Sequence, residues 1–290
     1  MTLKKSIPIV FIILASFILF ASCSTTPSNP VKQAAGDTSS RPGTQDAGTA
    51  APAGEASAAG KKDPINLNDT GKTVIKLIST SQTYPTNSFL IISKSGTVVA
   101  ADPFEPAAGV SPDVVTVTHP HPDHMDMNLL DKVKCKKILT KTGSFTVKDV
   151  QITGIPASHM GNEINLSSPS NVLYLYEIDG LRIVHMGDIG QDRLTDEQIK
   201  ALGHVDIAFM QFVNSYSDYS LENEKGFKLI EQIKPTLIIP THTTPEATAK
   251  IGQLVGKLET AENQIAVSTD DLRKSGRKVI DLKNTINGSK

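Results

Sequence analysis

The sequence predicts an α/β fold in which two β-sheets pack face to face, with helices on their outer sides. Short runs of β-branched and apolar residues, separated by polar turns, fill the first half of the segment from residue 71 to residue 290. In the second half of that segment, strand-like runs alternate with amphipathic helical patterns. A strand-rich half followed by strand–helix alternation fits two layered sheets better than a single doubly wound sheet.

The first predicted strands form a meander. Three short β-branched runs at Thr73–Thr80, Ser88–Ser93 and Thr97–Asp102 are separated by polar turns, which is typical of consecutive strands joined by hairpins. Further elements are strands at Val114–Thr118, Lys136–Thr140 and Val150–Pro156, and a short helix at Asp126–Val133.

A hairpin opens the second half of the domain. Asp179-Gly180 joins the strands Asn171–Ile178 and Leu181–Met186, and this dipeptide favours a two-residue hairpin turn because both residues tolerate positive φ. The remaining strands are predicted at Val205–Met210, Thr236–Pro240 and Arg277–Leu282.

Three helices are predicted between these later strands. Thr195 and Gln198 form a capping box that begins the first of them. Thr244 caps another helix, with Pro245 at its first position. The predicted helices are residues 195 to about Leu202, Ser220–Ile233, and Thr244 to about Leu258.

Residues 1–22 are predicted to be a lipoprotein signal peptide. Lys4 and Lys5 precede the apolar stretch Ile7–Ala21, which is shorter than a membrane-spanning helix needs. The small residues before Cys23 resemble a bacterial lipobox, in which the cysteine is lipidated. An ordinary signal peptide or an uncleaved anchor is the alternative. We therefore expect a protein of the bacterial cell envelope, anchored by a lipid on Cys23 and facing outside the cytoplasm.

Residues 23–70 are predicted to be a disordered tether, and residues 71–290 a single folded domain. From Ser24 to Lys62 the chain has no Leu, Ile, Phe, Met, Trp or Tyr, and Ala, Gly, Pro, Ser and Thr dominate. Such a segment cannot bury enough apolar surface to offset the entropy of ordering it.

The charge balance and the cysteine count disfavour several classes of protein. The chain has 29 Lys and Arg against 30 Asp and Glu, a formal net charge of −1, so there is no basic surplus for a nucleic-acid backbone. Two cysteines are too few for a disulfide scaffold or a Cys-rich zinc module. We expect no nucleic-acid partner.

Three of the seven histidines lie within six positions, in His119-Pro-His121-Pro-Asp123-His124. Alternate residues of an extended segment point to the same side, so His119 and His121 can hold one ion, and the proline after each favours extended geometry. Asp123 and His124 would point toward a second ion. Imidazole and carboxylate ligands suit Zn²⁺, and also Mn²⁺ or Fe. The alternative is a charged loop whose histidines face solvent.

With this cluster the chain resembles the metallo-β-lactamase superfamily, whose H-x-H-x-D-H signature is complete here. Four further positions of that family can be matched in order, and each ends or follows a predicted strand. They are Asp102 in A-A-D-P-F, His159 in A-S-H-M-G, Asp188 in H-M-G-D-I-G and His242 in I-I-P-T-H. The resemblance implies the αββα sandwich of that family, with two mixed β-sheets flanked by helices.

The resemblance also implies two divalent metal ions, of which Zn²⁺ is the first choice. The implied ligands are His119, His121 and His159 for one ion, Asp123, His124 and His242 for the other, and Asp188 shared between them. A hydroxide held between the ions would be the nucleophile, and Asp123 would orient it or pass a proton to the leaving group. Asp102 and His185 are not expected to bind the ions themselves but to orient the residues that do.

Several segments, including S-F-L-I and I-I-P-T-H, resemble the branch that contains the ascorbate-phosphate lactonase and N-acyl-phosphatidylethanolamine phospholipase D. That resemblance implies cleavage of an ester, lactone or phosphodiester in a small-molecule or lipid-like substrate. β-Lactam hydrolysis is disfavoured because no cysteine stands at the position of Asp188. Tyr216 and Asn214 are expected on the substrate rim. A non-catalytic metal-binding lipoprotein of the same fold is the alternative, and a bridging Asp188 favours the enzyme.

Overall fold

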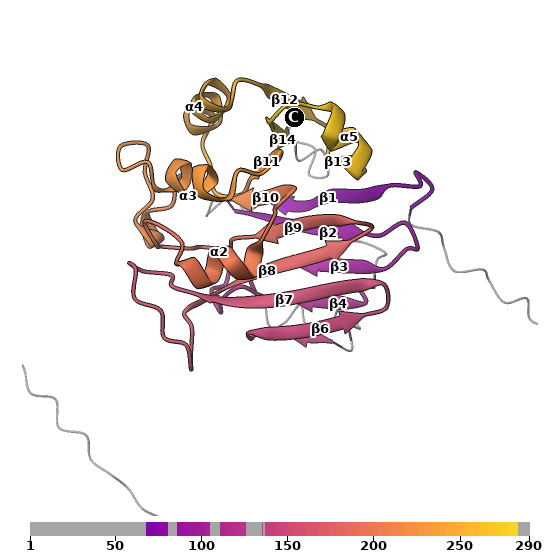
Figure 1. Cartoon of the computed structure of the whole chain (residues 1–290), viewed down its shortest axis with the longest axis horizontal. Coiled ribbons are helices and arrows are strands. Elements are labelled where there is room, and N and C mark those ends of the chain that lie inside the picture. The colour runs from indigo at the N-terminus through magenta and orange to yellow at the C-terminus, as the bar shows by residue number, and fades with distance from the viewer. Residues whose placement is uncertain (1–67, 81–85, 105–110, 126–134, 136, 284–290) are drawn as a thin grey trace, which may run out of the picture. The chain divides into compact units, whose positions relative to one another are not determined.

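The structure is a computed structural model that describes residues 68–80, 86–104, 111–125, 135 and 137–283 (Figure 1). All of these belong to the second of two compact units in the chain, Lys61–Lys290. The predicted signal peptide, Cys23, most of the predicted tether and the predicted helix Asp126–Val133 lie outside the described residues. Among the helices of the described part, none is both long and apolar enough to cross a membrane.

Six strands form the first sheet, in the order β13-β1-β2-β3-β4-β5. Their bounds are β1 Thr73–Thr80, β2 Asn87–Ile92, β3 Val98–Ala101, β4 Val114–Thr116, β5 Ile138–Leu139 and β13 Gln264–Val267. β1, β2 and β3 pair in antiparallel fashion, as a meander requires, whereas β4 and β5 join them in parallel. The sheet is therefore mixed.

Eight strands form the second sheet, in the order β12-β14-β11-β10-β9-β8-β7-β6. Their bounds are β6 Gly143–Val147, β7 Val150–Ala157, β8 Asn171–Ile178, β9 Leu181–His185, β10 Ile207–Met210, β11 Leu237–Pro240, β12 Leu258–Ala261 and β14 Lys278–Leu282. β6 to β9 are antiparallel neighbours, and β9, β10, β11, β14 and β12 run in parallel.

The main apolar core lies between the two sheets, which Figure 1 shows stacked, with β7 to β9 in front of β2 to β4. Phe89 of β2 stacks on Phe209 of β10 with ring centroids 4.5 Å apart. Tyr174 and Tyr176 of β8 are also fully buried there. Large aromatic side chains from both sheets therefore hold the layers together, because such rings bury the most apolar area per residue.

Three helices cover the outer face of the second sheet. They are α2 Asp196–Leu202, α3 Lys225–Ile233 and α4 Pro245–Val255. Leu202, Ile230 and Ile251 from these helices pack with the outward-facing residues of the sheet in a second apolar cluster. A short helix, α5 (Thr269–Lys274), places Leu272 against the core between the sheets. The predicted α/β architecture of two packed sheets with flanking helices is confirmed.

Two helix ends differ from the prediction. The helix expected over Ser220–Ile233 begins only at Lys225, because Ser220 and Asn223 hydrogen-bond each other's backbone and Glu224 has a φ of 57°. Side chains of this kind compete with helical bonds for the backbone. The last predicted helix ends at Val255 rather than near Leu258, because Gly256 adopts a φ of 89° as its C-cap.

Three strands and one α-helix of the described residues were missed by the sequence analysis: β6, β12, β13 and α5 (Thr269–Lys274). β6, β12 and β13 are edge strands of their sheets, and most of their side chains are exposed or half-buried. Edge strands bury little apolar surface, so they lack the hydrophobic pattern from which strands are predicted. The chain also passes from the second sheet to the first between β12 and β13, and β13 pairs there with β1.

Candidate metal centre

The carboxyl ends of four strands carry the predicted metal ligands. His119 follows β4 of the first sheet, whereas His159, Asp188 and His242 follow β7, β9 and β11 of the second. β7, β9 and β11 run in one direction, so their carboxyl ends lie at one edge of the sheet. Side chains far apart in the sequence therefore meet where the two sheets end.

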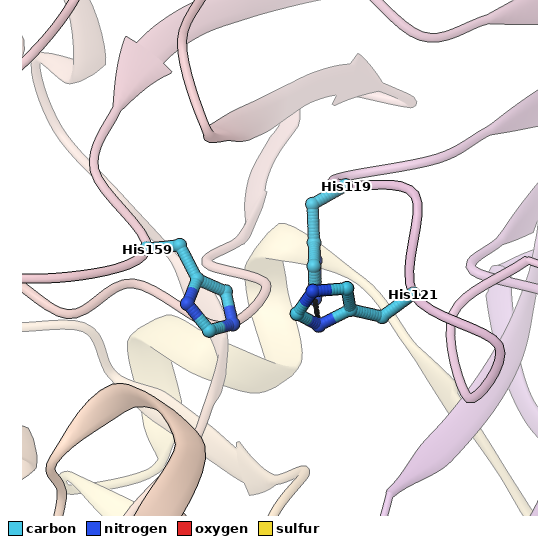
Figure 2. A group of neighbouring side chains, drawn as sticks. All are labelled: His119, His121 and His159. Carbon is cyan, nitrogen blue, oxygen red and sulfur yellow. Dashed lines mark hydrogen bonds between the residues drawn. The ribbon is translucent and has the colours of Figure 1, made fainter. Parts of the chain in front are cut away.

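The first group consists of His119, His121 and His159, whose imidazoles point toward one another (Figure 2). His119 Nε2 lies 3.1 Å from His121 Nδ1. The ring centroid of His159 is 4.9 Å from that of His119 and 4.8 Å from that of His121. One ring nitrogen from each residue lies within 4.8 Å of the others, which is close enough for one ion to contact all three.

The second group consists of Asp123, His124, Asp188 and His242, whose ligand atoms also lie within 4.8 Å of one another. Asp123 Oδ2 is 3.6 Å from Nε2 of His124 and 3.6 Å from Nε2 of His242. Asp123 is half-buried, and the other three side chains are buried. All seven predicted ligands thus lie in two neighbouring groups, three histidines in one and Asp188 with Asp123, His124 and His242 in the other.

Asp188, a member of the second group, also lies beside two histidines of the first. Its Oδ2 is 3.7 Å from Nε2 of His119 and 3.7 Å from Nε2 of His159. Its Oδ1 is 3.2 Å from His124 Nε2 and 3.3 Å from His242 Nδ1. Each oxygen therefore faces a different histidine group, which is the geometry of a shared carboxylate.

Gly187 allows Asp188 to reach this position. Its φ is +54°, and a Cβ on it would lie 2.5 Å from Asn171 Oδ1 and 2.6 Å from Thr118 Cβ. Only glycine combines that backbone conformation with so close an approach. The glycine before the aspartate in H-M-G-D is therefore needed for packing.

Four buried ligand atoms have no hydrogen-bond partner within the described part of the chain: His124 Nε2, His159 Nε2, His242 Nδ1 and Asp188 Oδ1. An unpaired buried polar atom costs free energy, and each of these atoms can offer a lone pair to a metal ion when it carries no proton. The donor set of imidazole and carboxylate suits Zn²⁺, and also Mn²⁺ or Fe. The residues present therefore fit the expected ions.

Burial and neighbouring charges shift the pKa values of the site in opposite directions. Burial alone would raise the pKa of Asp188, but the surrounding His242 and His124 outweigh it and hold that pKa well below its usual range. Burial would lower the pKa of His124, but Asp102 and Asp188 raise it to about 10. Burial and the nearby His124 lower the pKa of His119 to about 3. Asp188 is therefore ionised at neutral pH beside a neutral His119, and a neutral imidazole is the form that binds metal.

Comparison with known families agrees with this geometry. Residues 82–242, which span every predicted ligand, match the family model described as a beta-lactamase superfamily domain. The chain belongs to the metallo-β-lactamase superfamily.

Individual relatives agree with the superfamily assignment. A metal-dependent hydrolase of Pyrococcus furiosus is 24% identical over 174 residues, covering 50% of this chain and 76% of that protein. A second, from Thermococcus kodakarensis, is 25% identical over 178 residues with the same coverage. The structure of a candidate Zn-dependent hydrolase of the metallo-β-lactamase superfamily from Thermotoga maritima aligns with a TM-score of 0.56 at 20% identity, covering 73% of this chain and 100% of that one. The predicted fold and the predicted enzyme class, a metal-dependent hydrolase, are confirmed.

Asp102 is hydrogen-bonded to the metallo-β-lactamase signature segment and to the residue before it. Its carboxylate accepts hydrogen bonds from His124 Nδ1 at 2.7 Å, and from Thr118 Oγ1 at 2.6 Å and Thr118 N at 2.8 Å. His185 Nδ1 lies 3.6 Å from the same carboxylate. Asp102 therefore hydrogen-bonds one predicted ligand directly, and His185 lies against Asp102. The sequence analysis missed Thr118, although its place at the end of a predicted strand directly before His119 could have drawn attention to it.

The two predicted rim residues occupy different places. Tyr216 is 60% exposed and lines a pocket of about 230 Å³ together with His121, Asp123 and Asp188. Asn214 is only 5% exposed and donates a hydrogen bond from Nδ2 to Asp188 Oδ2 at 2.7 Å. Tyr216 is thus at the mouth of the site, whereas Asn214 lies inside it against a predicted ligand.

Proposed function

We propose that this chain uses two divalent ions, Zn²⁺ first with Mn²⁺ or Fe as alternatives, to hydrolyse an ester, a lactone or a phosphodiester. The observation that carries the proposal is Asp188, whose two oxygens face two separate histidine groups. A shared carboxylate is suited to two cations, because its charge reduces the repulsion between them. When bound, the two ions would supply a hydroxide at neutral pH and polarise the substrate oxygen under attack.

Asp123 is our candidate for proton transfer. It is half-buried and lines the pocket beside Tyr216, where a substrate can reach it. Burial acts to raise the pKa of its carboxyl, but His242 and His124 hold that pKa below its ordinary value. Oδ2 faces His124 and His242, so ionised Asp123 can accept a proton from the nucleophile at its other oxygen, Oδ1, and pass it to the leaving group. The phenol of Tyr216 can donate a hydrogen bond to a substrate oxygen in the same pocket.

A non-catalytic metal-binding protein of the same fold is the second candidate. A site that only delivers or stores one ion does not need a carboxylate shared between two groups. The half-buried Asp123 beside an accessible pocket also favours turnover.

The test combines metal analysis with a substrate screen. Protein loaded with Zn²⁺ or Mn²⁺ should bind two ions per chain and hydrolyse at least one of bis(p-nitrophenyl) phosphate, p-nitrophenyl esters or simple lactones. Asp188→Ala should abolish turnover. Asp192→Ala is the matched control, because this carboxylate belongs to the same loop but pairs with Lys225 instead of the histidines. Two bound ions with no turnover of any substrate would favour the non-catalytic candidate.

We also propose that the enzyme acts outside the cytoplasm, held by a lipid on Cys23. The support is the apolar N-terminal segment that ends in small residues and a cysteine. Cys23→Ser should move the protein from the membrane fraction to the soluble fraction in a bacterial host. Unchanged fractionation would contradict the anchor and leave the hydrolase proposal unaffected.

A further inference from the structure

Asn214 joins the candidate metal centre to the loop that carries Tyr216. It follows β10, and its Nδ2 lies 2.7 Å from Asp188 Oδ2 and 2.9 Å from Gln211 Oε1. Both N–H bonds of the side-chain amide are therefore used, one on the shared carboxylate and one on a buried glutamine. Gln211 is fixed in turn by its own amide, which donates to the carbonyl of Ile189 at 2.6 Å.

The orientation of the Asn214 amide is set by its oxygen. Oδ1 accepts a hydrogen bond from the backbone N–H of Tyr216 at 3.0 Å. The backbone of Asn214 pairs in both directions with Tyr219, at 2.9 and 2.8 Å. A flipped amide would lose the bond from Tyr216 and would place its oxygen against the Asp188 carboxylate. The network therefore allows only the orientation in which Nδ2 faces Asp188.

We propose that Asn214 is a positioning residue that fixes Asp188 Oδ2 toward the group formed by His119, His121 and His159. Oδ2 is the oxygen that faces His119 and His159. One of its lone pairs accepts from Asn214, and the other is left for an ion. The inference rests on the proposed metal centre. It predicts that the ion in this group depends on Asn214 more than the second ion does. The group itself contains only imidazoles, and Asp188 Oδ2 is the carboxylate oxygen that lies beside His119 and His159.

Asn214→Leu tests this, since leucine has a similar shape and no hydrogen-bond donor. Zn²⁺ binding would be measured by competition with a chromophoric chelator, and the visible spectrum would be recorded after Co²⁺ loading. One of the two ions should bind about 10–100-fold more weakly, which is the usual effect of removing a partner of a metal ligand. The Co²⁺ bands of that ion should change, while those of the second ion should stay.

Two further variants make the test specific. Asn214→Ser keeps an oxygen that can accept from the Tyr216 N–H but cannot reach Asp188, so it should weaken the same ion even if the leucine variant does not fold. Ser217→Ala is the matched control, because Ser217 Oγ donates to Gln211 Oε1 at 3.2 Å in the same network without touching Asp188. It should bind both ions like the unsubstituted protein.

The outcomes separate this inference from the proposed function. If the folded Asn214 variants bind both ions within twofold of the unsubstituted protein, or if Ser217→Ala shows the same loss, the positioning role is wrong and the hydrolase proposal stands. If the unsubstituted protein binds no metal, the proposed function fails and this inference fails with it.

Discussion

Replacing Asp102 with asparagine should weaken the metal centre without removing a ligand. Asp102 Oδ2 accepts the hydrogen bond from His124 Nδ1 at 2.7 Å, which leaves Nε2 as the atom that faces Asp123 and Asp188. Asparagine keeps the shape of aspartate and tolerates its φ of 45°. Its oxygen can still accept from Thr118 N, and its NH₂ group then faces His124 Nδ1.

The tautomer of His124 determines the size of the effect. An N–H of the asparagine would donate to Nδ1, so the imidazole proton would move to Nε2 and block the nitrogen meant for the metal. Binding would require either loss of that hydrogen bond or displacement of the proton. A hydrogen bond to a charged group contributes about 1.5–3 kcal/mol, and about 1.4 kcal/mol corresponds to a tenfold change in affinity. We therefore expect about 10–100-fold weaker binding of the ion at the second group.

The assay is Zn²⁺ competition with a chelator at pH 7, together with urea unfolding of the metal-free proteins. Asp149→Asn is the control, because Asp149 also accepts hydrogen bonds from hydroxyls, those of Ser95 and Thr97, but lies in the turn before β7, away from the site. It should leave Zn²⁺ affinity unchanged. Affinity of Asp102→Asn within twofold of the unsubstituted protein would refute the tautomer argument.

Three other predictions follow from the same geometry. In the metal-free protein the pKa of His124 is raised from 6.5 to about 10, so its charged form contributes stability that is fully present below pH 6.5 and lost as the pH rises toward 10. The urea concentration at the midpoint of unfolding should therefore fall between pH 6.5 and pH 10. A midpoint that does not change with pH would contradict the ion pair between His124 and Asp102. Gly187→Ala should destabilise the fold by about 2–5 kcal/mol, since strain at a φ of +54° adds to overlap with Thr118. Gly96→Ala, at a φ of +87° with nothing within 4 Å of its Cβ, should cost only the strain of about 1–2 kcal/mol in the same unfolding measurement. Zn²⁺ at 100 times its dissociation constant should raise the free energy of unfolding by about 2.7 kcal/mol, EDTA should reverse the gain, and Asp188→Ala should show less of it.

The parts of the fold that the sequence predicted well depend on local signals. Asp179 and Gly180 have φ values of 54° and 83°, as a two-residue hairpin turn requires, and Thr195 and Gln198 form the predicted capping box. The pairing of β13 with β1 depends instead on the point at which the chain passes from the second sheet to the first. No pattern within a four-residue edge strand encodes its distant partner.

The same distinction applies to the site. His119, His121, Asp123 and His124 could be predicted because ligand types are dense in one short segment. The contact between Asn214 and Asp188 could not, because it joins two loops 26 positions apart. An asparagine after a strand is equally typical of a turn, so the residue type alone does not distinguish a partner of Asp188 from a residue on the substrate rim.

The ligands come from both sheets, and this links the metal centre to the packing of the core. The segment after β4 supplies His119, His121, Asp123 and His124 from the first sheet, whereas Asp188 and His242 follow strands of the second. The two sets meet only while the sheets keep their relative position, which contacts such as the stacked Phe89 and Phe209 maintain. Because a preformed site does not exist in the unfolded chain, the free energy of metal binding adds to the stability of the folded state. Metal affinity is therefore expected to depend on core residues that no ion touches.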